Sequence, residues 1–222
     1  RHILDIIEKL IGSEINSNPV QNSRIKQPEK FLKKKILYDG LSGRTPWHQD
    51  AGVLSKKGQK HTDLITCWVP FTKTTKKNGC MITVPGLQKK GLFNHDADLK
   101  GQAYIRNSEL LNKLKTVALE ANPGDIVFLS KHTVHCSLPN ISNNFRISMD
   151  LRYHKSGQPS GRDTLPNFCV RSKNKKNIKI YNFKQWLALW EKAKQKCVPK
   201  KYTFKYQTPT FKGKKRDLIN LI

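Results

Sequence analysis

The chain has 222 residues, of which 36% are hydrophobic, and this is enough for one domain with a substantial core. No stretch approaches the roughly 18 uncharged apolar residues that a membrane span requires, so the sequence predicts no transmembrane segment. The formal net charge of +26 comes from lysines spread from Lys26 to Lys215. This spread favours a solvated surface, with attraction to nucleic acid or a phosphorylated ligand as the alternative.

Five cysteines are scattered along the chain and never form a CxxC pair: Cys67, Cys80, Cys136, Cys169 and Cys197. Their odd number and irregular spacing argue against a disulfide framework and against a zinc knuckle. We therefore expect mostly buried thiols in a reducing, cytoplasmic compartment. The chain begins at Arg1 without an initiator methionine, so the sequence does not decide whether a targeting segment precedes it.

The N-terminal part of the chain predicts a helix followed by a strand. Residues 2 to 12 carry Ile and Leu at helical spacing and end at Gly12, which predicts an amphipathic helix. A polar linker follows, and residues 33 to 40 have strand character up to a turn-like DGLSG. The segment TPWHQDAG, residues 45 to 52, comes directly after that turn.

The middle of the chain predicts short strands. Residues 62 to 71 and 79 to 86 are rich in β-branched and aromatic side chains, and together they predict a pair of strands. Residues 107 to 115 predict a short helix with Asn107 or Ser108 as its cap.

Two further strands are expected on either side of a turn at Pro123 and Gly124, within residues 116 to 137. Residues 145 to 154 alternate in polarity and predict another strand. Many short strands with few helices favour a mainly β fold, closed or sandwiched and antiparallel, such as a jelly roll with flanking α-helices.

Order weakens after residue 155. Residues 155 to 167 are turn-forming, residues 182 to 194 predict a helix, and the tail is basic. We expect that helix to pack onto the barrel through Trp186, Leu187, Leu189 and Trp190. The prediction is one domain over residues 1 to 222, with a barrel core at about 33 to 154 and a helical, basic extension at 155 to 222.

His48 and Asp50 are the first candidates for chemistry. An HxD pair alone is weak evidence, but residues i and i+2 of an extended strand point to the same side, so an imidazole and a carboxylate can meet one metal ion. A second imidazole would complete a facial triad, which leaves coordination positions open at an oxygen-activating Fe(II) centre.

Five histidines are candidates for the third ligand: His61, His95, His132, His135 and His154. His135 is favoured because it follows the apolar segment DIVFLS, where the chain would leave a barrel rim. His132 is the nearest rival, since periodicity does not separate two histidines three residues apart. Arg146 lies eleven residues after His135 on the next expected strand, where an antiparallel return would let its guanidinium hold the carboxylate of a co-substrate.

Several segments between residues 33 and 154 together resemble one protein family. PWHQD, CWVPF, NGCMITVPG and PGDIVFLSKHTVHCSLPNISNNFRISMDLRY are similar, in order and spacing, to the phytanoyl-CoA dioxygenase family of iron- and 2-oxoglutarate-dependent oxygenases. The resemblance implies a double-stranded β-helix, the cupin-like jelly roll. It also implies that Fe(II) is held by His48, Asp50 and His135.

The same resemblance assigns the co-substrate site. Arg146 would bind the distal carboxylate of 2-oxoglutarate, and Gln49, Trp68 and Ser137 match positions that line the co-substrate pocket. The implied reaction uses O2 to convert 2-oxoglutarate into succinate and CO2 while a small-molecule substrate is hydroxylated. Asp50 favours hydroxylation, because related halogenases have a small residue there. The chain departs from the family at residues 85 to 88, where PGLQ replaces the common PGSH.

Three functions stay open at this stage. The first is a hydroxylase of a small molecule, and the positive charge would suit an anionic one. The second is a nucleic-acid oxidative demethylase, since Arg146 and Arg152 stand six residues apart; the intervening ISMDL lacks the Asn and Thr expected there, so nucleic acid is not the expected specific substrate. The third is a binding module without turnover. The sequence predicts neither the substrate nor the oligomeric state.

Overall fold

The computed structural model describes residues 2–32, 43–97 and 102–197. The strand expected at residues 33 to 40 lies outside this part of the chain. The described residues fall into two compact units. The larger unit comprises residues 22–53 and 66–151, and the smaller unit comprises residues 2–21, 54–65 and 152–197, less the gaps just given. Each unit is described by itself.

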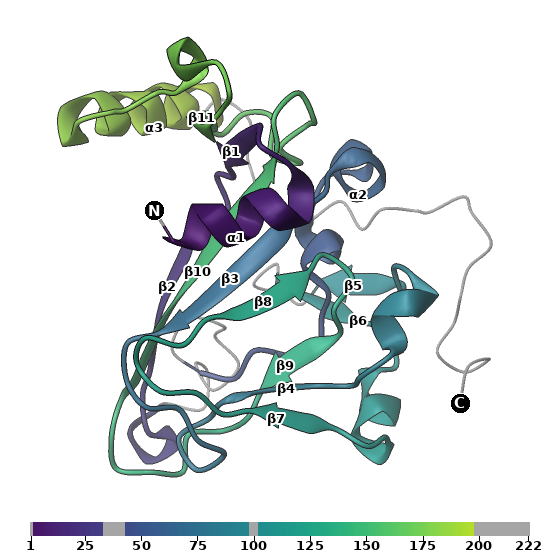
Figure 1. Ribbon diagram of the computed structural model, residues 1–222. Helices are drawn as coiled ribbons and strands as arrows, with labels where there is room; N and C mark the ends of the chain where they lie inside the picture. Colours follow the sequence, from purple (N-terminus) through teal and green to yellow (C-terminus); the bar gives the residue numbers. More distant parts are fainter. Residues whose placement is uncertain (1, 33–42, 98–101, 198–222) are drawn as a thin grey trace. The chain divides into compact units, whose positions relative to one another are not determined.

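The larger unit contains two sheets that share a core (Figure 1). In the first sheet β10 (Arg146–Lys155) lies between β2 (Asn22–Lys26) and β3 (Ile65–Pro70), and β3 also pairs with β8 (Val127–Ser130). The second sheet has the order β7 (Val117–Leu119), β4 (Met81–Thr83), β9 (His135–Ser137), and its pairs are antiparallel.

Apolar side chains from the two sheets pack against each other. Trp68 of β3 and Leu129 of β8 form one buried cluster with Met81 of β4. A second cluster, around Trp47, Val134 and Cys136, lies beside the two-stranded sheet of β5 (His95–Ala97) and β6 (Ala103–Ile105). Two antiparallel sheets that face each other across a shared core confirm the expected mainly β fold.

One local prediction in this unit is wrong, and a second is confirmed as a helix but without the expected side-chain cap. The segments at 62 to 71 and 79 to 86 do form strands, β3 and β4, but these lie in different sheets, because the loop between them carries the chain across the core. The expected helix at 107 to 115 is a 3-10 helix, Ser108–Lys113, without a side-chain cap. Asn107 instead adopts a left-handed backbone, which asparagine tolerates better than most residues.

The smaller unit joins the two expected helices to a short sheet. Helix α1 (His2–Ile11) ends where Gly12 has a φ of 91°, as predicted. Strand β1 (Ile15–Ser17) pairs with the last residues of β10 on one side and with β11 (Phe168–Arg171) on the other. Helix α2 (Lys56–His61) and helix α3 (Phe183–Cys197) complete the unit.

The expected packing of α3 is partly wrong. Trp186 and Leu187 are 41% and 39% exposed, and Leu189 and Trp190 are half-buried. The buried side chain on this helix is Ala193. A small residue lets the helix backbone approach its neighbours closely, so the packed face lies further along the helix than the run of large apolar side chains indicates.

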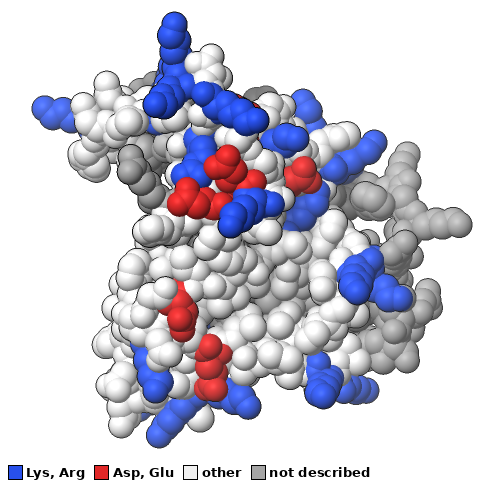
Figure 2. Space-filling model, in the orientation of Figure 1, with Lys and Arg blue, Asp and Glu red and all other residues white. Residues whose placement is uncertain are grey.

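The placement of the charged side chains and the burial of the cysteines agree with the expectations from the sequence. The Lys and Arg side chains visible in Figure 2 are spread over both units, with Asp and Glu among them. Four cysteines have described side chains and all are free thiols, three of them buried. None of the helices in the described residues is both long enough and apolar enough to cross a bilayer.

We predict that Gly58→Ala destabilises the chain although Gly58 lies in helix α2. Helix propensity alone would favour alanine by about 1 kcal/mol. A Cβ at this position, however, would lie 2.5 Å from the Gly161 Cα, a backbone atom with little room to move. Overpacking of this kind costs about 1 to 3 kcal/mol, so the clash outweighs the propensity. Urea denaturation followed by circular dichroism, with the exposed Lys57→Ala on the same helix as control, measures the difference.

His154 in the smaller unit makes stability depend on pH. Asn18 is fixed by two backbone bonds, from the Val20 N–H to its Oδ1 and from its Nδ2 to the Ser160 carbonyl. That Nδ2 lies 3.3 Å from His154 Nδ1, which must therefore accept, so the imidazole is neutral. Burial lowers the pKa of His154 from 6.5 to about 4. The unfolded chain consequently binds the extra proton at a higher pH than the folded chain does.

We therefore expect the free energy of unfolding to fall as the pH is lowered from about 6.5 to about 4, and this slope to flatten in His154→Gln. Denaturation at a series of pH values measures the slope. An NMR titration of the wild-type imidazole gives the same information without a substitution. An ordinary pKa for His154 would contradict the prediction.

Candidate metal centre

A pair of backbone hydrogen bonds joins His48 to His135. The His48 N–H donates to the His135 carbonyl at 2.9 Å, and the His135 N–H donates to the His48 carbonyl at 3.0 Å. The two residues thus form an isolated antiparallel bridge, and their rings lie 4.2 Å apart. Residues far apart in the sequence are held side by side before any ligand binds.

Asp50 reaches the same place by a turn of the chain. The expectation that residues 48 to 50 form one extended strand is wrong, because Asp50 begins a 3-10 helix, Asp50–Val53. The Ala51 N–H donates to the Lys131 carbonyl and the Gly52 N–H to the Gln49 carbonyl, which fix this turn. The carboxylate is therefore positioned by a helix start and not by the alternation of side chains along a strand.

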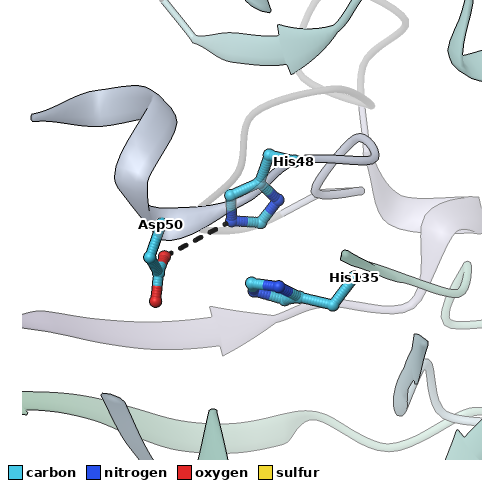
Figure 3. Close-up of side chains that lie close together, drawn as sticks. All are labelled: His48, Asp50 and His135. Carbon is cyan, nitrogen blue, oxygen red and sulfur yellow. Dashed lines mark ion pairs between the residues drawn. The ribbon is translucent and has the colours of Figure 1, made fainter. Parts of the chain in front are cut away.

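The three side chains point toward a common position (Figure 3). Each offers one ligand atom, and these atoms all lie within 4.8 Å of one another. His48 Nε2 and Asp50 Oδ1 are 3.8 Å apart, and all three residues are buried. Two imidazoles and one carboxylate at this separation can hold one divalent transition-metal ion and leave coordination positions for other ligands.

Hydrogen bonds fix which ring nitrogens face that position. His48 Nδ1 lies 2.9 Å from the Pro46 carbonyl, and His135 Nδ1 lies 2.9 Å from the Thr133 carbonyl. A carbonyl oxygen only accepts, so each Nδ1 carries the hydrogen and each Nε2 keeps its lone pair. Thr66 Oγ1 donates to Asp50 Oδ2 and orients the carboxylate. Burial, followed by the nearby His135, lowers the pKa of His48 to about 3, which keeps the ligand neutral.

Among the described histidines of the larger unit, His135 is the one that joins His48 and Asp50. Its rival His132 is half-buried, and its carbonyl accepts a hydrogen bond from Gln49. His95 is buried but lies on strand β5, where it has a different set of partners.

The side chain of Gln49 is fully buried between the two ligands of its own segment. Its Nε2 donates to the carbonyls of Gly91 and His132, each at 2.8 Å, and its Oε1 accepts from the Phe93 N–H at 2.8 Å. These three bonds tie the segment that carries His48 and Asp50 to two other stretches of backbone.

His95 completes this arrangement, in a role that sequence reasoning missed when it considered His95 only as a third metal ligand. His95 Nδ1 donates to the Phe93 carbonyl at 2.9 Å, so its Nε2 accepts from the Gln49 N–H at 3.0 Å. The imidazole also lies against Gly52, where an added Cβ would come within 2.4 Å of the ring. We call Gln49 and His95 together the Gln49–His95 clasp.

Arg146, Ser137 and Trp68 lie in the same unit. Arg146 is 2% exposed; its Nη1 donates to Ser148 Oγ at 2.6 Å and its Nη2 to the Gly79 carbonyl at 3.1 Å. Its guanidinium lies 5.6 Å from the Trp68 ring centre. Ser137 and His135 are the two ends of the short strand β9, so Ser137 lies on the same strand as a candidate metal ligand.

Lys26 is a further buried residue that sequence reasoning missed. Its Nζ donates to Ser137 Oγ at 2.6 Å, and its side chain is almost fully buried. The polar linker expected at this point in fact contains strand β2, and β2 carries Lys26 inward. A lysine in a polar segment gives no sequence signal, because nearly all lysines lie on the surface.

Two relatives each match more than half of the chain. A probable phytanoyl-CoA dioxygenase from Caenorhabditis elegans is 29% identical over 157 residues, covering 68% of this chain and 47% of that protein. A 2-aminoethylphosphonate dioxygenase from an uncultured bacterium is 30% identical over 127 residues, covering 56% of this chain and 45% of that protein. The chain thus spans about half the length of these relatives.

Solved structures share the fold. The non-heme monooxygenase ThoJ, in its apo form, superposes with a TM-score of 0.62 over 87% of this chain and 70% of that chain, at 18% identity. The family profile described as Phytanoyl-CoA dioxygenase (PhyH) matches residues 4–148, which include all three converging side chains and Arg146. The chain belongs to the phytanoyl-CoA dioxygenase family.

Proposed function

We propose that this chain is an Fe(II)- and 2-oxoglutarate-dependent dioxygenase that hydroxylates a small molecule. The observation that carries the proposal is the convergence of His48, Asp50 and His135, with both histidines in the tautomer that a metal requires. Membership of the family supports the choice of iron and of 2-oxoglutarate. Two nitrogens and one carboxylate oxygen are the donor set of the non-heme oxygenases, so the residues fit the group.

In this proposal the ferrous ion, when bound, supplies the activation of O2 that couples conversion of 2-oxoglutarate into succinate and CO2 to hydroxylation. The residues of the chain have separate tasks. His48, Asp50 and His135 would hold the ion and, being only three ligands, would leave it open to co-substrate and O2. Arg146 binds the distal carboxylate of 2-oxoglutarate, for which its planar guanidinium is suited. Buried Trp68 and Ser137 would line the same pocket.

We assign Gln49 a positioning role in place of the co-substrate contact that the resemblance implied. Its amide nitrogen and oxygen are bonded to three backbone groups. An amide engaged in this way holds the segment that bears two ligands and has little capacity for a bound organic acid. The Gln49–His95 clasp then fixes the distance between His48 and Asp50.

The substrate class that we propose is a small anionic molecule. The chain is strongly basic, and one relative is named for an aminoethylphosphonate. The nucleic-acid demethylase is less well supported. Arg152, which that function would need beside a base or phosphate, is 3% exposed and donates to the Val20 carbonyl.

The first prediction from this proposal concerns metal and co-substrate. Anaerobic addition of Fe(II) and then 2-oxoglutarate should produce a weak charge-transfer band in the visible, and His135→Ala should abolish it because one of the three ligands is gone. His132→Ala is the matched control and should keep the band. Succinate release across a panel of small acids and phosphonates, in the wild type and in Asp50→Ala, then tests turnover.

The outcomes separate the candidate functions. A band without succinate release for any member of the panel would favour a binding module. Release stimulated by alkylated oligonucleotides, with an affinity that falls steeply as salt is raised, would favour the demethylase. Absence of the band from the wild type would reject the proposed enzyme.

The second prediction concerns the Gln49–His95 clasp. His95→Leu should weaken Fe(II) or Mn(II) binding by about ten- to a hundredfold, the usual effect of losing a group that orients a metal ligand. Gly52→Ala should act in the same direction, since its Cβ would displace the imidazole. Calorimetric titration with Mn(II) measures the affinity directly.

The exposed His61→Leu is the control for this experiment and should bind metal as the wild type does. Thermal denaturation without metal separates loss of affinity from loss of fold. Wild-type affinity in a folded His95→Leu chain would remove the positioning role.

A further inference from the structure

Two basic side chains, a lysine and an arginine, lie opposite each other inside the larger unit. In the antiparallel register of β2 and β10, Lys26 lies directly opposite Arg146. Both side chains are 2% exposed. When both groups are protonated their charges repel, and burial raises the cost because water no longer screens them, so the lysine gives up its proton more readily than an exposed one. An anion bound between the two groups would offset this repulsion and favour the charged form of both.

The anion is not supplied by the part of the chain that the structure describes. Lys26 donates to Ser137 Oγ, a neutral group, and no ion pair joins Lys26 or Arg146 to a carboxylate among the described residues. The nearby acidic groups are engaged elsewhere. Glu29 accepts two hydrogen bonds from Arg44, and Asp150 accepts one from Arg24.

Two buried donors beside this pair also lack partners. Arg146 Nε and Trp68 Nε1 are buried, and neither makes a hydrogen bond to any of the residues that the structure describes. The Arg146 guanidinium lies near the Trp68 ring, so both donors belong to one neighbourhood. Unsatisfied buried N–H groups are costly, and a ligand carboxylate, with two oxygens and several lone pairs, can accept from more than one of them.

We propose that Lys26 and Arg146 together bind the distal carboxylate of the co-substrate, an arrangement that we call the two-cation seat. Ser137, the last residue of strand β9, accepts a hydrogen bond from the lysine. This inference rests on the proposed function, because it takes the co-substrate to be 2-oxoglutarate. It adds a residue, Lys26, that makes direct contact with the diacid. The methylene part of Lys26 packs on Gly79, which keeps the ammonium in place: a Cβ at Gly79 would lie 2.8 Å from Lys26 Cδ and Cε.

The seat should couple diacid binding to a proton. Burial, then the charges of Arg146 and Arg24, lower the pKa of Lys26 to about 6, against smaller opposing effects of Glu29 and Cys136. Near pH 8 the unliganded lysine is therefore mostly neutral. A bound carboxylate favours the charged form, so binding takes up a proton, and affinity for the diacid should fall as the pH rises above about 6.

The test compares two ligands in anaerobic, Fe(II)-loaded chains. 2-Oxoglutarate carries the distal carboxylate, and 2-oxopentanoate lacks it but keeps the 2-oxo acid. Calorimetry at pH 8, in buffers of different ionisation enthalpy, gives both affinity and proton uptake. Lys26→Met keeps the unbranched side chain and removes the charge, and the exposed Lys89→Met is the matched control.

We expect Lys26→Met to bind 2-oxoglutarate about ten- to a hundredfold more weakly, the loss expected for a charge-assisted hydrogen bond, with little change for 2-oxopentanoate. Proton uptake should disappear in this variant and persist in Lys89→Met. Unliganded Lys26→Met should unfold at the same or a higher temperature than the wild type, because an apolar side chain replaces a buried amine whose removal from water is costly.

The two levels of the proposal fail differently. If the wild type does not bind 2-oxoglutarate, the proposed function is wrong. If the wild type binds it and Lys26→Met binds it equally well with the same proton uptake, the two-cation seat is wrong and the enzyme proposal stands. An equal loss for both ligands in Lys26→Met would also overturn the seat, because the lysine would then act on the fold and not on the distal carboxylate.

Discussion

The backbone bridge between His48 and His135 is the constraint on which the site depends. Two hydrogen bonds fix the separation of two imidazoles that are far apart in the sequence, and each ring is turned by a bond from its own Nδ1 to a carbonyl two residues earlier. The remaining nitrogens must then face the same position. Asp50 is added by a short 3-10 helix that begins at this point. The geometry of the candidate metal site is thus built largely from hydrogen bonds to main-chain groups.

The surrounding packing protects this arrangement. Gln49 and His95 join the ligand-bearing segment to neighbouring backbone, and no large rearrangement is needed to assemble the three donors. Burial keeps His48 neutral, which is the protonation state that binds a metal. The same burial that stabilises the core around Trp47 therefore also determines the chemistry of the residue that follows it.

The larger unit accepts unfavourable electrostatics near the site. Lys26, Arg146 and the indole of Trp68 bring charges and donors out of water without acidic partners among the described residues. Buried groups of this kind destabilise a fold unless something binds to them. These groups lie on β2, β10 and β3. Lys26 also donates a hydrogen bond to Ser137 on β9, the strand that carries His135, so the unfavourable groups lie beside the candidate metal site.

The sequence by itself determined the mainly β class, the two helices at residues 2 to 12 and 182 to 194, and the family resemblance, and it named His48, Asp50, His135 and Arg146 as candidate site residues. These follow from local periodicity and from motifs whose residues are close in the chain. Only the tertiary structure decided which sheet β3 and β4 join, that Asp50 begins a 3-10 helix, and that Lys26 and His95 are buried. Long-range pairing sets those outcomes: Lys26 opposes Arg146 and His95 accepts from Gln49, and neither contact leaves a trace in local composition.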